Sequence, residues 1–342
     1  MTLAIELAYW QETLVKLAVI LAVIPAGALV LGYVFLMKMM SHMQSRLGPM
    51  EAGPHGVLQL VADGVKFLQK EDVFPERADR FVFGAAPVVV LMGTFLIYAV
   101  IPAGPDLVIA DLDTGIFFAL GVSAVSVIGV LMAGWSSASK YSLLGGLRSA
   151  GQLVAYELPL VFAVVGVVMQ AGSLNLQDIV RYQAEGAIFG FDGLGLPLLL
   201  PQLVGFVLFM IAAQAELIQA PFDMPVAESE LVGGYYVEYT GFRFLLFFMG
   251  EFGTAFALSA IAATLFLGGW WVPGIDLDSN LANIVGPIAL FAKIMLVAFF
   301  IFWVRFTYPR FREDQLQAFA WKWLVQIALL NVLVTGAFMV VI

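Results

Sequence analysis

Apolar stretches of about 20 residues alternate with short polar segments along the whole chain. A stretch of this length can cross the roughly 30 Å hydrocarbon core of a membrane as a helix. The pattern predicts eight spanning helices, at about residues 14–37, 82–102, 115–135, 152–171, 194–213, 242–268, 285–305 and 318–342. We therefore expect an all-α polytopic membrane protein whose residues 1–342 form a single membrane domain.

Residues 57–70 show helical periodicity but are too short and too polar to cross a membrane. Their apolar face carries Val57, Val61, Val65 and Leu68, and their polar face carries Gln59, Asp63, Lys66 and Lys70. This pattern predicts an amphipathic helix lying in the membrane interface, inside a first loop over residues 38–81. Its apolar side could form the entrance for a lipid-soluble substrate, or it could be only a surface helix with a solvated face.

The composition agrees with a membrane protein and restricts its chemistry. Hydrophobic residues make up 62% of the chain and charged residues 12%, against about 25% charged in soluble domains. The absence of cysteine excludes thiolate-bound iron–sulfur clusters and disulfides within the chain. Both histidines, His42 and His55, fall in the first loop, so a haem held between helices is not expected. Because the chain has neither a P-loop nor a dinucleotide fingerprint, any redox centre would belong to a partner.

The distribution of cations predicts the orientation. If the first loop is cytoplasmic, 13 of the 16 Lys and Arg residues lie in cytoplasmic loops, which by the positive-inside rule places both termini outside. The first apolar run is too long for a cleavable signal and no basic segment precedes it, so we expect it to remain as a helix. No sequence feature suggests nucleic-acid binding.

An acidic stretch from Gln214 to Glu251, whose residues 214–241 are expected to form a cytoplasmic loop, is unusual beside apolar runs. Its six carboxylates are Glu216, Asp223, Glu228, Glu230, Glu238 and Glu251, with Arg243 the only cation among them. Acids at membrane depth usually face a protein interior or a wet cavity and mark proton or ion paths. Pro221 and Pro225 predict that one helix stops near Gln219 and another starts around Pro225. Glu228 and Glu230 could alternatively only compensate the dipole of that second helix.

Three further features are open to two interpretations each. Glu157 lies inside the fourth span beside Pro159, where it could join a proton path or pair with Arg148. Lys293, in the seventh span, could pair with Glu251 or lie near the outer interface. Residues 134–149, which are polar and rich in small side chains, are predicted to form a short loop suited to close contact with another surface.

Several motifs, taken in order, resemble the NuoH family, the quinone-site membrane subunit of respiratory complex I (NADH:quinone oxidoreductase). They are Arg46-Leu47-Gly48-Pro49 with Gly53-Pro54, Ala62-Asp63-Gly64-Val65-Lys66, Lys70-Glu71-Asp72, Gly134-Trp135 through Gly145, Leu147-Arg148-Ser149 with Tyr156-Glu157-Leu158, Ala215-Glu216, Pro221-Phe222-Asp223-Met224-Pro225, Glu228 with Glu230-Leu231-Val232-Gly233-Gly234-Tyr235, Glu238-Tyr239, and Leu265 through Trp270. Together these motifs cover nearly the whole chain.

The resemblance implies an eight-helix subunit at the heel of an L-shaped complex in a bacterial inner membrane. There it would close a quinone chamber with the hydrophilic arm and connect that chamber to the pumping subunits by a hydrated carboxylate path. The expected path residues are Glu157, Glu216, Asp223, Glu228, Glu230 and Glu251. The expected chamber residues are Arg46, Gln59, Ala62, Asp63, Lys66, Phe67, Phe222, Met224 and Arg243.

The resemblance also implies which groups and partners take part. The chain itself would bind no cofactor and no metal, and quinone would be its substrate. FMN, NADH and the iron–sulfur clusters would be held by partner subunits. The expected partners are the hydrophilic-arm quinone-site subunits, the iron–sulfur subunit, the small and antiporter-like membrane subunits, and lipid.

Two departures from the family pattern lie around the first loop. Many members carry Glu-Arg where this chain has Leu36-Met37, and Asn-Arg-Val where it has Met50-Glu51-Ala52. An acid thus replaces a cation near the expected chamber mouth. A related subunit of an energy-converting hydrogenase or ferredoxin-driven complex is therefore an alternative function, and a proton-coupled transporter is another.

Overall fold

The computed structural model describes residues 9–186, 195–277 and 279–341, and these consist of helices joined by turns and loops, without a strand. Seven helices in the described residues are long and apolar enough to cross a membrane. They are α1 (Tyr9–Leu31) continued by the π-helix η1 (Gly32–Met39) and α2 (Met40–Met43), α4 (Arg80–Ile97), α5 (Gly115–Ser123) with α6 (Val125–Ser136), α7 (Lys140–Ala171), α11 (Gly241–Phe266), α12 (Asn280–Thr307), and α13 (Glu313–Phe319) with η5 (Ala320–Leu324) and α14 (Val325–Val341). The prediction of an all-α polytopic membrane protein is confirmed.

The fifth expected span, at 194–213, has different bounds in the structure. Residue 194 lies outside the described residues, and residues 198–202 form turns, so that α9 runs only from Leu203 to Glu216. Pro197 and Pro201 explain the late start, because proline cannot donate a backbone hydrogen bond inside a helix. With 14 residues, α9 is about 21 Å long, which is shorter than a membrane core.

The predicted loop over residues 134–149 is wrong for most of its length, because α7 already begins at Lys140. Its small residues serve helix packing. A Cβ atom on Gly134 would lie only 3.0 Å from the Cα atom of Gly146, and one on Gly145 would lie 2.6 Å from the Cα atom of Gly234. Small side chains allow backbones to approach this closely in membrane bundles.

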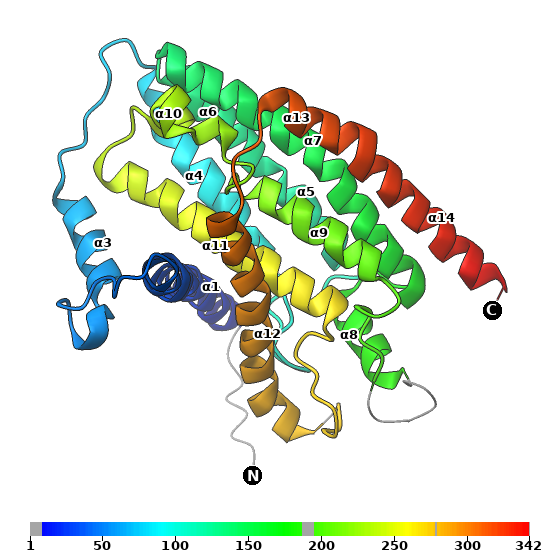
Figure 1. Cartoon of the computed structure of the whole chain (residues 1–342). Coiled ribbons are helices and arrows are strands. Elements are labelled where there is room, and N and C mark those ends of the chain that lie inside the picture. Colours follow the sequence, from blue (N-terminus) through cyan, green and yellow to red (C-terminus); the bar gives the residue numbers. More distant parts are fainter. Residues whose placement is uncertain (1–8, 187–194, 278, 342) are drawn as a thin grey trace.

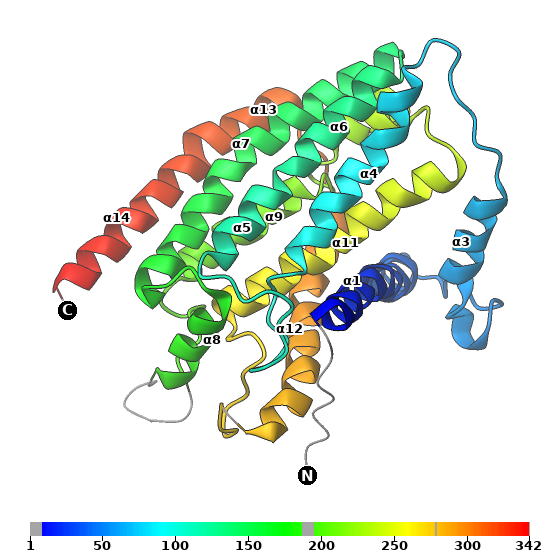
Figure 2. The same ribbon diagram turned by 180° about the vertical axis from the view of Figure 1, so that it is seen from behind.

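The helices form one bundle around α11 (Figures 1 and 2). Almost every residue of α11 from Phe252 to Phe266 is buried. Helices α4, α6, α7, α9 and α14 lie side by side on one flank of α11, while α12 crosses it and α1 packs against it on the other flank. The loop that connects α9 to α11 lies at one end of the bundle, where it packs against α6 and α7.

Two amphipathic helices complete the fold. The predicted helix in the first loop is present as α3 (Gln59–Gln69), which projects beside the end of α1 and has no buried residue. A second one, α8 (Leu176–Glu185), was not predicted. Its start is marked by Asn175, whose side-chain oxygen accepts a 2.7 Å hydrogen bond from the Gln177 backbone N–H.

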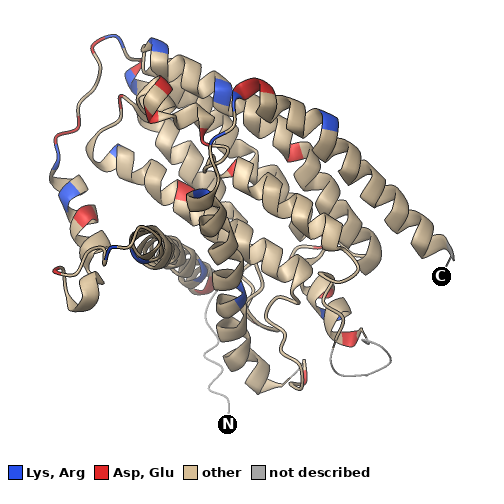
Figure 3. Cartoon of the chain, viewed as in Figure 1, with Lys and Arg blue, Asp and Glu red and all other residues tan. Residues whose placement is uncertain are grey.

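Charged side chains gather at one end of the bundle, around the end of α6 and the starts of α7 and α13, while the middle of most helices is free of them (Figure 3). The loops at this end include those expected to be cytoplasmic. The orientation of the termini stays a prediction.

Candidate functional site

The segment between α9 and α11 is a folded loop with little regular helix. It contains the short helical turns η3 (Met224–Val226), α10 (Glu228–Leu231) and η4 (Gly234–Tyr236). The preceding helix ends at Glu216, three residues before the predicted stop near Gln219. The expected new helix around Pro225 is reduced to these turns, so a four-residue α10 offers Glu228 and Glu230 only a small dipole to compensate.

Buried amides hold this loop against its neighbours. The side-chain amide of Gln152, on α7, donates 2.8 Å hydrogen bonds to the carbonyl oxygens of both Ala215 and Phe222. The amide of Gln214 donates a 2.7 Å bond to the Ala220 carbonyl. Because Gln152 and Gln214 are buried, these bonds are shielded from water and give the loop one fixed position.

Gly234 sets the direction of the chain where the loop meets α7. Its φ of +63° lies in the left-handed region, and a Cβ atom there would collide with the Pro225 carbonyl oxygen. Gly145 of α7 packs directly on this turn. The two glycines together allow the following residues, Tyr235 and Tyr236, to reach inward between α6, α7 and α11.

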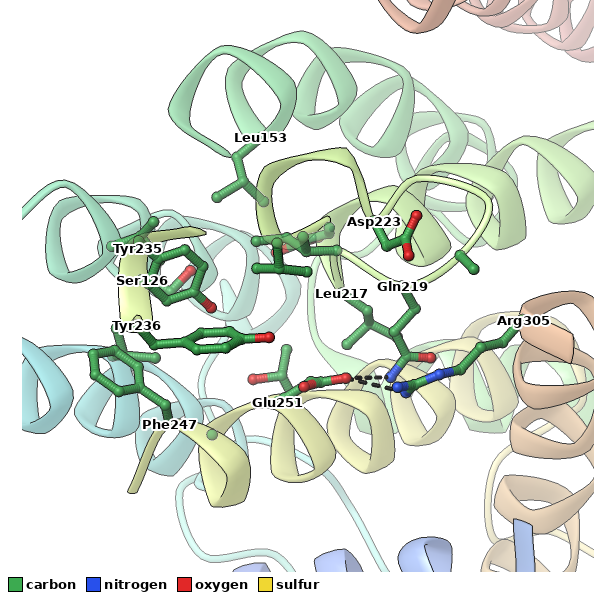
Figure 4. Close-up of a pocket in the computed structure, with 18 of the residues that line it drawn as sticks. Ser126, Leu153, Leu217, Gln219, Asp223, Tyr235, Tyr236, Phe247, Glu251 and Arg305 are labelled. Atoms are coloured by element: carbon green, nitrogen blue, oxygen red, sulfur yellow. Dashed lines mark hydrogen bonds and ion pairs between the residues drawn. The ribbon is translucent and has the colours of Figure 1, made fainter. Parts of the chain in front are cut away.

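A cavity of about 320 Å³ lies between this loop, α11 and the end of α12, and four of the predicted path acids line it. They are Glu216, Asp223, Glu228 and Glu251, of which Asp223 and Glu251 are labelled in Figure 4. The cavity has room for several water molecules and offers them polar partners on most sides. Carboxylates separated by up to 35 residues in the sequence thus meet around one space.

Two arginines at the end of α12 and just beyond it bind acids of this cavity. Arg305 donates a 3.1 Å hydrogen bond to Oε1 of Glu251, and the amide of Gln219 donates another of 3.1 Å to the same oxygen (Figure 4). Arg310 donates hydrogen bonds of 2.6 and 2.7 Å to the two carboxylate oxygens of Asp223. This bidentate geometry is the strongest form of such a pair, and the bonds to Asp223 keep the pKa of Arg310 above its usual value.

Two buried oxygens on the cavity wall have no hydrogen-bond partner among the described residues. They are Oε2 of Glu216 and Oε1 of Gln219. Buried polar atoms are nearly always satisfied by protein or by ordered water.

Two predicted path acids lie outside the cavity wall. Glu230 accepts a 2.8 Å hydrogen bond from Arg148, which also approaches Glu313 at 3.4 Å. The alternative that Arg148 pairs with Glu157 is therefore wrong. Glu157 is half-buried in the middle of α7, within electrostatic range of Glu216.

The alternative pairing of Lys293 with Glu251 is also wrong, because Glu251 is bound by Arg305. The Lys293 ammonium donates 2.8 Å hydrogen bonds to the carbonyl oxygens of Gly269 and Trp271. These carbonyls belong to the loop that follows α11. Lys293 thus anchors the loop at the opposite end of α11 from the cavity loop.

The predicted chamber residues fall into two separate groups. Those of the first group lie on and around α3. The Asp63 carboxylate accepts hydrogen bonds from the Gln59 amide, at 3.2 Å, and from the Lys66 ammonium, at 3.1 Å. The Phe67 ring packs against that of Phe244 on α11, with a centroid separation of 5.5 Å. Arg243 binds Asp72 at 2.7 Å and covers the ring of Phe74.

Two further residues of the first group are exposed. Ala62 lies on α3, and Arg46 lies in the loop before it, where its guanidinium donates a hydrogen bond to the side-chain oxygen of Gln44.

The second group is Phe222 and Met224, which are only 4% and 2% exposed. The ring of Phe222 packs against Tyr156 and Phe311, away from the acidic cavity. The structure therefore does not bring these two residues together with those on α3.

The polar groups of Gln219, Tyr236, Arg305 and Arg310 also line the cavity, and none of these residues is among the predicted site residues. The sequence favours a positively charged membrane anchor for Arg305 and Arg310, which is the usual role of cations beside a span. No sequence signal identifies their partners, because those lie 54 and 87 residues away. In the described residues, no group of three or more His, Cys, Asp or Glu side chains could hold a metal ion.

Comparisons with known proteins agree with this architecture. The model of the NADH dehydrogenase family matches residues 15–336. The chain is 44% identical over 329 residues to an NADH-quinone oxidoreductase subunit of Brevibacillus brevis, covering 96% of this chain and 94% of the relative. It is 45% identical over 334 residues to an NADH-quinone oxidoreductase subunit of Syntrophobacter fumaroxidans, covering 94% of both, and 42% identical over 335 residues to one of Rhodothermus marinus, covering 95% of this chain and 96% of the relative. The chain, with its acidic cavity inside a bundle of membrane-length helices, belongs to the NADH dehydrogenase family.

Proposed function

We propose that this protein is a membrane-arm subunit of a proton-translocating NADH:quinone oxidoreductase. In this function it forms a quinone chamber with the hydrophilic arm and carries a carboxylate path that links quinone reduction to proton pumping. The observation that carries the proposal is the 320 Å³ cavity lined by Glu216, Asp223, Glu228 and Glu251. The names of the relatives support membership of such a complex.

The path begins at the loop acids and continues through the cavity. Glu228 and Asp223 form its part on the loop, and Glu216 on α9 and Glu251 on α11 continue it across the cavity. Glu157 on α7 continues the path toward the side of the bundle, since it lies within electrostatic range of Glu216. Glu230 joins it at the surface of the loop. Because such acids are coupled, they share protons as a set rather than titrating one by one.

The quinone chamber lies on the α3 side. The apolar face of α3 is exposed, with Val65 and Leu68 at 49% and 61%. That face, together with Phe67 and Phe244, suits the tail of a lipid-soluble quinone. Arg46, Gln59, Ala62, Asp63, Lys66 and Arg243 form the polar part of the chamber, and Phe222 and Met224 support the loop between chamber and path.

The remaining components come from the assembly. Quinone is the substrate, and FMN, NADH and iron–sulfur clusters reside in partner subunits of the hydrophilic arm. The small and antiporter-like membrane subunits receive the coupling. In the membrane α9 acts as the eighth spanning element, with both termini outside and the loops over 38–81 and 214–241 in the cytoplasm. The names of the relatives favour this function over a hydrogenase-type subunit or a free-standing transporter.

The test replaces Glu216 or Glu228 by Gln in the assembled complex. Each change removes a proton-carrying group while keeping the size of the side chain. We expect quinone-coupled proton pumping in membrane vesicles to fall, with assembly and NADH-to-ferricyanide electron transfer unchanged. Glu12→Gln is the matched control, because Glu12 is exposed on α1 and pairs only locally with Lys16. Normal pumping in an assembled Glu216 or Glu228 variant would remove that residue from the path.

A further inference from the structure

The phenol group of Tyr236 occupies a position in the acidic cavity that the carboxylates alone do not explain. Tyr236 belongs to η4, and its ring extends across the cavity with the hydroxyl directed toward Glu251 (Figure 4). Glu228 and Asp223, from the loop before η4, line the same cavity. The hydroxyl thus faces the same cavity as the acids of the loop and the acid of α11.

Aromatic contacts fix the direction of this ring. Tyr235 meets it edge to face with a centroid separation of 5.0 Å, and Phe244 of α11 does the same at 5.7 Å. Such pairs contribute about 0.5–1.5 kcal/mol each beyond the area they bury. A ring held from two directions keeps its hydroxyl in one part of the cavity.

The surroundings keep the hydroxyl neutral. Burial is the main cause that raises the pKa of Tyr236, and the negative charge of Glu251 adds to it, while Arg305 opposes both. A neutral phenol offers one proton to donate and lone pairs to accept another. It can therefore pass a proton without becoming charged.

Glu251 presents only part of its carboxylate to such a group. Its Oε1 atom already accepts hydrogen bonds from Arg305 and from Gln219. A carboxylate oxygen that binds a cation is a poor proton acceptor. Oε2 is therefore the oxygen of Glu251 that can exchange a proton with the cavity.

We propose that the Tyr236 hydroxyl is a relay between Glu251 and the loop acid Glu228, because both oxygens of Asp223 are already bound by Arg310. In one transfer, a protonated acid gives its proton to the phenol oxygen, directly or through a cavity water, while the phenol proton passes to the carboxylate on the other side. One O–H bond forms on Tyr236 as another breaks, so its charge is unchanged and no electron moves. Rotation of the hydroxyl then resets it. This inference rests on the proposed proton path and adds a residue to it.

The experiment uses Tyr236→Phe in the complete complex in membrane vesicles. The change removes a single oxygen and keeps the aromatic contacts, so assembly should be normal. We expect proton pumping per vesicle to slow at least about tenfold. This is less than the roughly 10²- to 10⁴-fold effect of a positioned acid or base, because cavity water can carry part of the transfer. The solvent deuterium isotope effect on coupled quinone reduction should rise, since proton relay becomes the slow step.

Tyr239→Phe is the matched control. The Tyr239 hydroxyl donates a 3.1 Å hydrogen bond to the Phe83 carbonyl, and Tyr239 does not line the cavity. This control should pump at the wild-type rate with an unchanged isotope effect. Wild-type pumping by Tyr236→Phe would overturn the inference, and so would slow pumping without a rise in the isotope effect, which would indicate a structural role.

The same assays separate this inference from the proposed function. If the Glu216 and Glu228 variants lose pumping while Tyr236→Phe keeps it, the path stands and the relay fails. If the Glu216 and Glu228 variants also pump normally, the path itself fails.

Discussion

The ion pair between Arg310 and Asp223 should control how tightly the cavity loop closes. It joins the loop to the segment after α12 through two hydrogen bonds of 2.6 and 2.7 Å. The change Asp223→Asn removes the negative charge but keeps the shape of the side chain. We expect it to favour open states of the loop.

The magnitude follows from the partial exposure of the pair. The side chains of Arg310 and Asp223 are 32% and 22% exposed. Fully exposed pairs contribute about 0.2–1 kcal/mol, and breaking a buried pair costs about 3–5 kcal/mol. This pair lies between these limits, and the amide oxygen of Asn retains part of the contact, so we expect a loss of about 1.5 kcal/mol. That loss corresponds to roughly a tenfold increase in the open population.

The assay uses a thiol introduced at Val226, which lines the cavity. Since the chain has no cysteine of its own, the Val226→Cys thiol is the only one in this protein. The rate at which a bulky maleimide labels it reports the population of open loop. Labelling should be about tenfold faster when Asp223→Asn is added.

Asp63→Asn is the control, because it breaks the exposed pair with Lys66 on α3. It should leave the labelling rate of Val226→Cys unchanged. An equal rate with and without Asp223→Asn would refute the view that this ion pair closes the loop.

Two further predictions concern packing and substrate entry. Gly145→Val should destabilise the protein by about 1–3 kcal/mol and lower the melting temperature of the complex, because its side chain would push against Gly234. Gly151→Ala on the same helix has room and should have little effect, and equal melting temperatures would contradict the packing argument. Val65→Trp should raise the KM for quinone without changing NADH-to-ferricyanide transfer, since Val65 is exposed on the apolar face of α3. An unchanged KM would show that this face does not line the entrance.

Local patterns in the sequence were sufficient for much of the architecture. Hydrophobic runs located the membrane-length helices, because burial in a membrane requires continuous apolar surface within each segment. The helical periodicity of apolar positions in residues 57–70 predicted α3, because one face of an amphipathic helix must be apolar. The acidic stretch was also visible, since charge beside apolar runs is a property of nearby residues.

Small residues misled the prediction where packing decides the structure. Gly145 and Gly146 suggested a loop, but they lie inside α7 because close neighbours require positions without a side chain. The bounds of α9 were misjudged for a different reason. The apolar run was treated as one helix, although Pro197 and Pro201 interrupt it.

The sequence by itself determined that this is a membrane bundle with an acidic stretch between two of its helices. Only the tertiary structure decided which acids share a cavity, and that Arg305 binds Glu251 and Arg310 binds Asp223. Only the tertiary structure also placed Tyr236 in that cavity and the Lys293 ammonium in hydrogen-bond contact with a backbone carbonyl oxygen. The physical reason is that hydrophobicity and periodicity act over a few residues, whereas these pairings depend on how helices far apart in the sequence pack together.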